Sequence, residues 1–117
     1  MEKINTLLEK YNNFKDAQIR SIENISDSSK LLTLVIQDDD GEDVSKVKVT
    51  FNNVRDSKIL VNDVLPFLDM MSGISIIKEN NLYGFAVGRG SAMLHVNSAP
   101  LYIISSDIEV KEIKEQI

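Results

Sequence analysis

The chain has 117 residues, a net charge of −5 and no cysteine. This length suits one domain with a buried core, and we expect residues 1–117 to form a single domain. Without cysteine, a disulfide framework and thiolate catalysis are both excluded. No stretch approaches the roughly 18 apolar residues that span a bilayer, and residues 1–10 lack the basic start and apolar run of a secretory signal. We therefore expect a cytoplasmic protein that does not bind membranes.

The acidic balance of the chain argues against nucleic-acid binding. That function normally needs a concentrated basic face that displaces counterions from phosphates. The lysines of this chain are scattered and usually stand beside acidic residues. An acidic surface keeps a protein in solution, and it also steers a basic partner by long-range attraction.

The start of the chain has the pattern of an amphipathic helix. Ile4, Leu7, Leu8 and Tyr11 recur at helical spacing, which predicts one helix over residues 1–13. From Lys15 onward the period changes, and residues 15–117 are expected to be mostly strands.

The first half of this region predicts a strand followed by a hairpin. A strand is expected over residues 17–26, and alternating residues then predict strands over 31–37 and 46–51. Between the last two, residues 38–43 read Asp-Asp-Asp-Gly-Glu-Asp, which is turn chemistry. The side chains expected in the core of this hairpin are Leu32, Leu34, Ile36, Val47, Val49 and Phe51.

The second half predicts one short helix and several further strands. Asn62 or Asp63 is a suitable cap for a helical turn that Gly73 would stop. Strands are expected over residues 74–78 and 82–87, joined by a tight turn at Asn80-Asn81, and over 93–96, 101–105 and 107–111. Short strands with polar turns predict a mainly β fold (α+β by composition), an antiparallel β-sandwich or open barrel with the N-terminal helix over one end or face.

Two motifs resemble ligand sites but lack the residues that those sites need. If Gly41 took the sixth position of an EF-hand loop, Ile36 would be first and Val47 twelfth, and neither is an oxygen ligand. Gly88-Arg89-Gly90-Ser91 lacks the third glycine of a dinucleotide loop and the Gly-Lys-Ser/Thr ending of a P-loop. We interpret the first as an exposed hairpin tip and the second as a turn between strands. The candidate partner-binding residues are Asp38, Asp39, Asp40, Glu42, Asp43 and Arg89.

The sequence carries no recognisable catalytic or metal-binding constellation. His95 is the only histidine, and neither Ser91 nor Ser98 stands in a nucleophile elbow. One histidine without cysteine does not make a transition-metal site of the ordinary type. We therefore expect a protein that is not an enzyme, with no catalytic residue, no metal and no cofactor.

Several phrases of the sequence resemble a loose group of small bacterial β-rich proteins. The phrase Phe14-Lys15-Asp16-Ala17-Gln18-Ile19 is similar to the F-x-D-A-x-I opening strand of that group, although the histidine usual at its second position is Lys15 here. The strand pair and residues 101–109 are similar too. Several members of the group resemble immunity proteins encoded beside bacterial toxins. The resemblance therefore implies a binder that neutralises a toxin, but it transfers no functional residue.

Two functional hypotheses remain. The first is a non-catalytic protein-binding domain, an immunity protein whose partner is a basic toxin domain. Its basis is the acidity of the chain, because an acidic protein associates quickly with a basic partner. The second is a small-ligand-binding or housekeeping β domain, with an apolar pocket lined by residues such as Met70, Met71, Phe85 and Met93.

Overall fold

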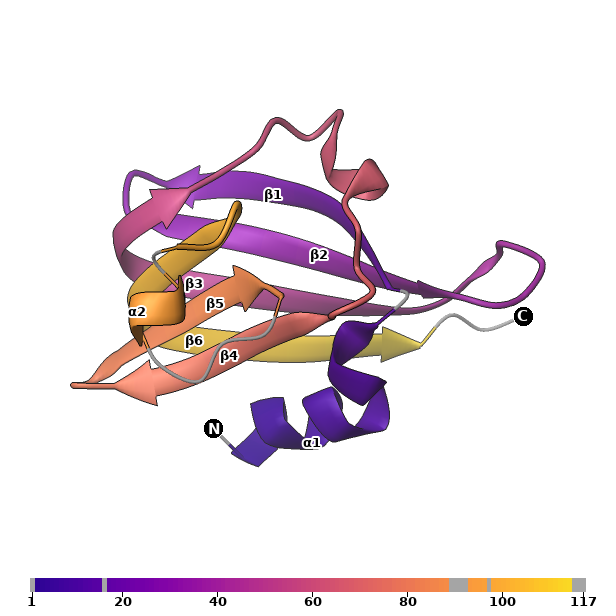
Figure 1. Cartoon of the computed structure of the whole chain (residues 1–117), viewed down its shortest axis with the longest axis horizontal. Helices are drawn as coiled ribbons and strands as arrows, with labels where there is room; N and C mark the ends of the chain where they lie inside the picture. Colours follow the sequence, from indigo (N-terminus) through magenta and orange to yellow (C-terminus); the bar gives the residue numbers. More distant parts are fainter. Residues whose placement is uncertain (1, 16, 89–92, 97, 115–117) are drawn as a thin grey trace.

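A computed structural model of the chain describes residues 2–15, 17–88, 93–96 and 98–114 (Figure 1). The fold is mainly β, as the alternation predicts, with an N-terminal helix and short helical turns. In chain order, the elements are α1 (Glu2–Lys10), the 3-10 turn η1 (Asn12–Phe14), β1 (Gln18–Ser26), β2 (Ser29–Gln37), β3 (Asp43–Lys58), the 3-10 turn η2 (Leu65–Phe67), β4 (Ile74–Glu79), β5 (Leu82–Val87), α2 (Met93–Val96) and β6 (Tyr102–Lys114).

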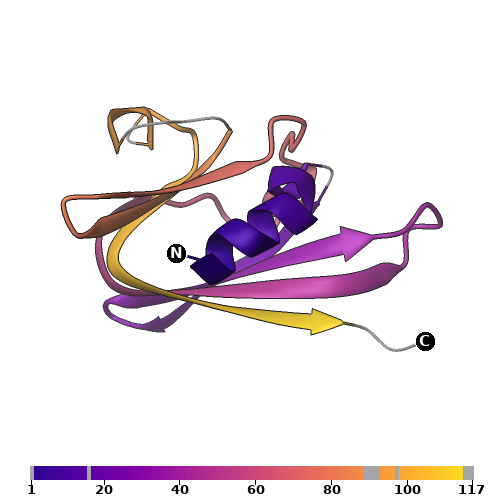
Figure 2. The ribbon, with the colours of Figure 1, turned by 90° about the horizontal axis from the view of Figure 1, so that it is seen from below.

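The six strands of the described residues form one antiparallel sheet, in the order β1-β2-β3-β6-β5-β4. The expected sandwich or barrel is not what the described residues form, because they make one sheet that stays open, with β1 and β4 at its edges. The reason is the length of the two central strands. Strand β3 has 16 residues and β6 has 13, and the segments predicted as separate strands over 101–105 and 107–111 are one strand. These long strands curve, so the sheet has a concave and a convex face (Figure 2).

Helix α1 lies on the concave face of the sheet (Figure 2). Its buried side chains Ile4 and Leu7 join the main hydrophobic core. The helix ends at Lys10, earlier than predicted, because Asn12, Asn13 and Phe14 all have φ between 52° and 60°. Asparagine tolerates this left-handed region better than most residues, so the Asn-Asn pair ends the helix and turns the chain toward β1.

The predicted hairpin supplies the centre of the core. Strands β2 and β3 pair as expected, with Leu34 opposite Val47 and Leu32 opposite Val49. Phe51 is fully buried, and its ring centroid lies 5.6 Å from that of Phe85 on β5. The predicted burial is confirmed for Leu32, Leu34, Val47, Val49 and Phe51, whereas Ile36 is only partly buried at the edge of this core.

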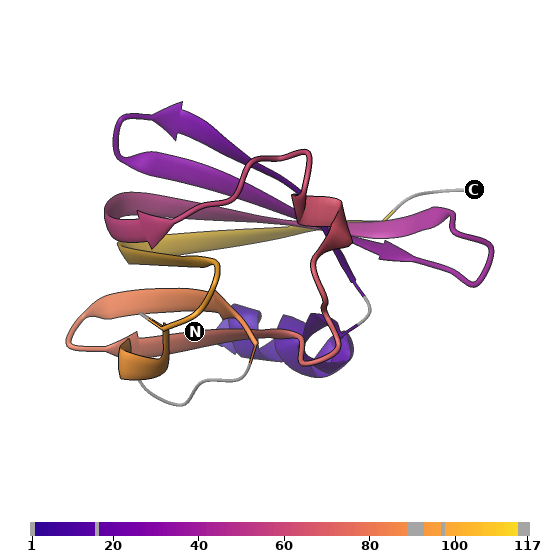
Figure 3. The same cartoon turned by 45° about the horizontal axis from the view of Figure 1, so that its top comes forward.

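The predicted internal helix is only a single 3-10 turn. Pro66 stands at its start and the chain is extended again at Leu68, so the helical pattern stops after Phe67. Asn62 does not cap this turn. Its side-chain oxygen accepts a hydrogen bond of 3.0 Å from the backbone N–H of Ile22 on β1, and Leu65 inserts into the core. The β3–β4 connection is thereby fixed over β1 (Figure 3).

Residues 93–96 form a helical turn, and the strand predicted there is wrong. Met93 and Val96 of α2 pack against Gly84 of β5, where a side chain would overlap them. The glycine therefore provides the space in which a compact turn replaces a seventh strand. The neighbouring hairpin is as predicted, because Asn80 and Asn81 join β4 to β5 with φ of 54° and 64°.

Candidate functional site

The acidic hairpin tip is held in shape by the residue that opens it. The backbone N–H of Asp38 donates to the carbonyl of Glu42 at 2.9 Å, and the N–H of Gly41 donates to the carbonyl of Asp38 at 3.0 Å. The Asp38 carboxylate accepts hydrogen bonds from the N–H groups of Asp40 (2.9 Å) and Glu42 (3.0 Å). The Asp38 carboxylate is therefore occupied by hydrogen bonds within the turn, as aspartate side chains typically are in such turns.

Three carboxylates remain available at this tip. Asp39, Asp40 and Glu42 are exposed, and among the described residues their side chains form no hydrogen bond or ion pair. The tip projects beyond the sheet at one end of the long axis (Figures 1 and 3). The structure thus separates the five predicted acids into one turn-forming residue, these three exposed residues, and Asp43.

Asp43 belongs to strand β3 rather than to the tip. Its carboxylate accepts hydrogen bonds from Gln37 (3.0 Å) and from the guanidinium of Arg20 (3.2 and 3.3 Å). The hydrogen bond from Gln37 and then the one from Arg20 hold the pKa of Asp43 below its ordinary value. Asp43 therefore ties β1, β2 and β3 together, and its charge is already neutralised. The sixth predicted residue, Arg89, lies outside the described residues.

A second exposed feature was missed by the sequence prediction. Four large apolar side chains of the β3–β4 connection point to solvent, and Phe67 is the most exposed of them at 86%. The same connection buries Leu65 completely, so one side of it packs on the core and the other side faces solvent. The exposed set is Val61, Val64, Phe67 and Met71, which we call the apolar loop. No local pattern of the sequence distinguishes these four side chains from the buried Leu65.

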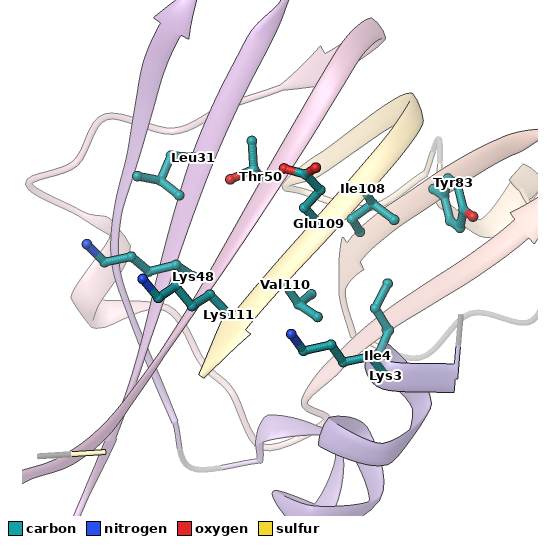
Figure 4. A pocket seen from close by; sticks show the side chains of 10 residues that line it. All are labelled: Lys3, Ile4, Leu31, Lys48, Thr50, Tyr83, Ile108, Glu109, Val110 and Lys111. Atoms are coloured by element: carbon teal, nitrogen blue, oxygen red, sulfur yellow. The ribbon is translucent and has the colours of Figure 1, made fainter. Parts of the chain in front are cut away.

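A third feature is an open depression of about 650 Å³ that wraps around the outer edge of β6 (Figure 4). Strand β6 contributes side chains to it from both faces of the sheet. Ile108 and Val110 point to the concave side, where α1 and Tyr83 lie, and Glu109 and Lys111 point to the convex side. The residues that line it are Lys3, Ile4, Leu31, Lys48, Thr50, Tyr83, Ile108, Glu109, Val110 and Lys111.

The charges of this depression are unbalanced. Lys48 on β3 stands directly opposite Lys111 on β6, and cross-strand pairs of like charge are unfavourable. Lys3 adds a third ammonium group from α1. Within the part of the chain that the structure describes, none of these three lysines forms an ion pair. Of the lining residues that the structure describes, only Glu109 is acidic, so this described lining carries a net positive charge on an acidic protein.

The four residues expected to line an apolar pocket do not come together. Phe85 and Met70 belong to the main core, whereas Met93 packs with Val96 and Ile104 in a second cluster across the sheet. Met71 is exposed and belongs to the apolar loop. The described residues therefore do not form the pocket that the sequence suggested.

Other kinds of site find little support in the described residues. They include no group of three or more His, Asp or Glu side chains that could hold a metal ion, and His95 lies exposed on α2. None of the helices that can be described is long and apolar enough to cross a membrane. Comparison with family models, curated proteins and solved structures finds no significant match to the chain.

Proposed function

We propose that this chain is a non-catalytic protein-binding domain, and that its partner is a toxin domain which it neutralises as an immunity protein. The observation that carries the proposal is the apolar loop. Burying a side chain such as Phe67 in an interface contributes about 1.5–3 kcal/mol. Aromatic residues of this kind are frequent hot spots, and clustered exposed apolar residues are typical of interaction surfaces.

The acidic tip supports a basic partner. The tip and η2 both lie in the right-hand half of the molecule in Figures 1 and 3. An interface with an apolar centre and charged residues around it is the usual arrangement between proteins. The exposed carboxylates of Asp39, Asp40 and Glu42 would then accelerate association, while the apolar loop would slow dissociation.

The test uses the proteins encoded beside the gene for this chain. One of them should bind the purified chain and be inactivated by it. Phe67→Ala should weaken that complex by about thirtyfold or more, as expected for a hot spot of about 2 kcal/mol. The proposal fails if no neighbouring product binds, or if the complex forms equally well with Phe67→Ala.

A charge experiment tests the basic nature of the partner. The variant Asp39→Asn/Asp40→Asn/Glu42→Gln should lower the association rate at low salt and leave the dissociation rate unchanged. A matched control removes three other exposed acids, in Glu9→Gln/Glu23→Gln/Asp27→Asn, and has the same net charge. Equal rates for the two variants would mean that net charge, and not the tip, attracts the partner.

A further inference from the structure

The outer edge of β6 lacks a strand partner over most of its length. Strand β5 pairs with β6 only from Tyr83–Ser105 to Ala86–Tyr102, whereas β6 continues to Lys114. Beyond Ser105, no strand among the described residues pairs with the side of β6 that faces away from β3. Natural proteins usually block such an edge, because its free N–H and C=O groups can pair with another chain.

The pairing pattern identifies the backbone groups that point outward. The carbonyl of Leu101 accepts a hydrogen bond from Val87 on the β5 side. The Leu101 side chain lies in the main core, against which Ile108 and Val110 also pack, so the alternation shifts by one residue between Leu101 and Ile108. Residues of one strand whose side chains share a face direct their backbone groups to the same side, and those of Ile108 and Val110 therefore point outward. The N–H of Val54 on β3, whose side chain packs on the same core, donates to the carbonyl of Ser28 beside β2 at 2.8 Å. This agrees with the direction, because β3 runs opposite to β6. Asp107, Glu109 and Lys111, whose side chains lie on the convex face, instead direct their backbone groups toward β3.

We infer that this edge binds an extended acidic segment of a partner protein, which adds to the sheet as a strand beside β6. Its backbone would pair with Ile108 and Val110, in the depression that already borders them (Figure 4). Alternate side chains of an added strand fall on the two faces of the sheet. Carboxylates on one face would lie beside Lys48 and Lys111, and apolar side chains on the other would contact Ile108 and Val110.

The charge of the depression selects this occupant. An incoming carboxylate neutralises the opposed Lys48 and Lys111, which have no acidic partner among the described residues. A second copy of the chain would bring the same net-positive surroundings to the edge. The inference goes beyond the proposed function, because neither the apolar loop nor the acidic tip contributes a residue to this depression.

The probe is a capped hexapeptide of alternating glutamate and valine, compared with one of alternating lysine and valine. The backbone amides of the full-length chain are followed by NMR during titration and during hydrogen exchange. With the acidic peptide, the amides of Ile108 and Val110 should shift and become protected. Those of Glu109 and Lys111 should be protected already in the free protein, since they are bonded to β3.

Charge variants separate this site from general attraction. Lys48→Gln/Lys111→Gln should weaken binding of the acidic peptide by about tenfold, the loss of affinity expected for two exposed ion pairs. The control Lys30→Gln/Lys58→Gln makes the same change of charge outside the depression and should bind as the parent does. Lys48→Glu/Lys111→Glu should reverse the preference and favour the lysine peptide.

Several results would overturn the inference. These are protection of the Ile108 and Val110 amides in the free protein, no shift at millimolar peptide, or equal binding of both peptides by the parent. Dimerisation of the parent through β6 would assign the edge to a second copy instead. Phe67→Ala should bind the acidic peptide as the parent does, so failure at this edge is distinguishable from failure of the proposed function.

Discussion

Gly73 lies directly against the backbone of Asn13, and a side chain at Gly73 would overlap the Asn13 carbonyl oxygen. Gly73 also has a φ of +71°, a region that other residues adopt only with strain. The start of β4 therefore approaches the turn after α1 closely only because position 73 is glycine. Gly73→Ala should lower the free energy of unfolding by about 2–4 kcal/mol, the sum of backbone strain and overpacking. Urea denaturation measures this loss.

Gly41 provides a matched control for this prediction. Its φ is +80°, but nothing lies within 4 Å of the place that a side chain would take. Gly41→Ala should therefore cost only the backbone strain, about 1 kcal/mol. If the two variants lose equal stability, the contact with Asn13 is not what restricts position 73.

The second prediction concerns the contact of Phe51 with Phe85. Phe51 is fully buried, so Phe51→Ala should cost about 3–5 kcal/mol of unfolding free energy. Phe67→Ala removes the same atoms from a side chain that is 86% exposed and should change stability by no more than about 0.5 kcal/mol. A loss below about 1 kcal/mol for Phe51→Ala would contradict the burial of this side chain.

The third prediction is a pH dependence at Asp43. Hydrogen bonds from Gln37 and Arg20 lower the pKa of Asp43 in the folded state below its ordinary value of 3.8. A lowered folded pKa stabilises the protein above the ordinary value, and this contribution is lost as the pH falls through the folded pKa. Asp43→Asn should therefore cost stability at neutral pH, by no more than about 1 kcal/mol for such an exposed pair. The difference from the parent should shrink in acid.

Arg20→Gln is the companion experiment for Asp43. It removes the second hydrogen-bond donor to the carboxylate and leaves Gln37 in place. Part of the pH dependence should therefore remain in this variant, whereas Asp43→Asn should lose all of that contribution. Unfolding measured in urea over a range of pH compares the three proteins. An unchanged pH profile in Asp43→Asn would contradict the role given to these hydrogen bonds.

Features with a local cause could be predicted from the sequence. The Asp38 turn, the Asn80-Asn81 turn and the alternation of strands β2 and β3 each depend on residues close together in the chain. The single sheet could not be predicted in the same way. It depends on the pairing of β3 with β6, from Ser45 opposite Lys114 to Lys58 opposite Tyr102, and no local pattern specifies that register.

The candidate sites likewise differ in whether local sequence or tertiary pairing determines them. The exposure of Asp39, Asp40 and Glu42 was predictable because turn composition alone indicates it. The depression at β6 was not, because it exists only where β5 stops pairing at Tyr83. Lys48 and Lys111 each belong to an alternating segment, but only the tertiary register places them opposite one another.

The last prediction follows from that opposition of Lys48 and Lys111. Opposite charges across a strand pair contribute about 0.2–1 kcal/mol, so Lys48→Glu should raise the free energy of unfolding by about that amount. High salt should reduce the gain by screening. Lys58→Glu makes the same change of charge opposite Tyr102 and should give no comparable gain. Urea denaturation at low and high salt compares them. A stabilised Lys48→Glu that no longer binds the acidic peptide would indicate that the parent retains an unfavourable lysine pair for binding, whereas a destabilised one would contradict the repulsion.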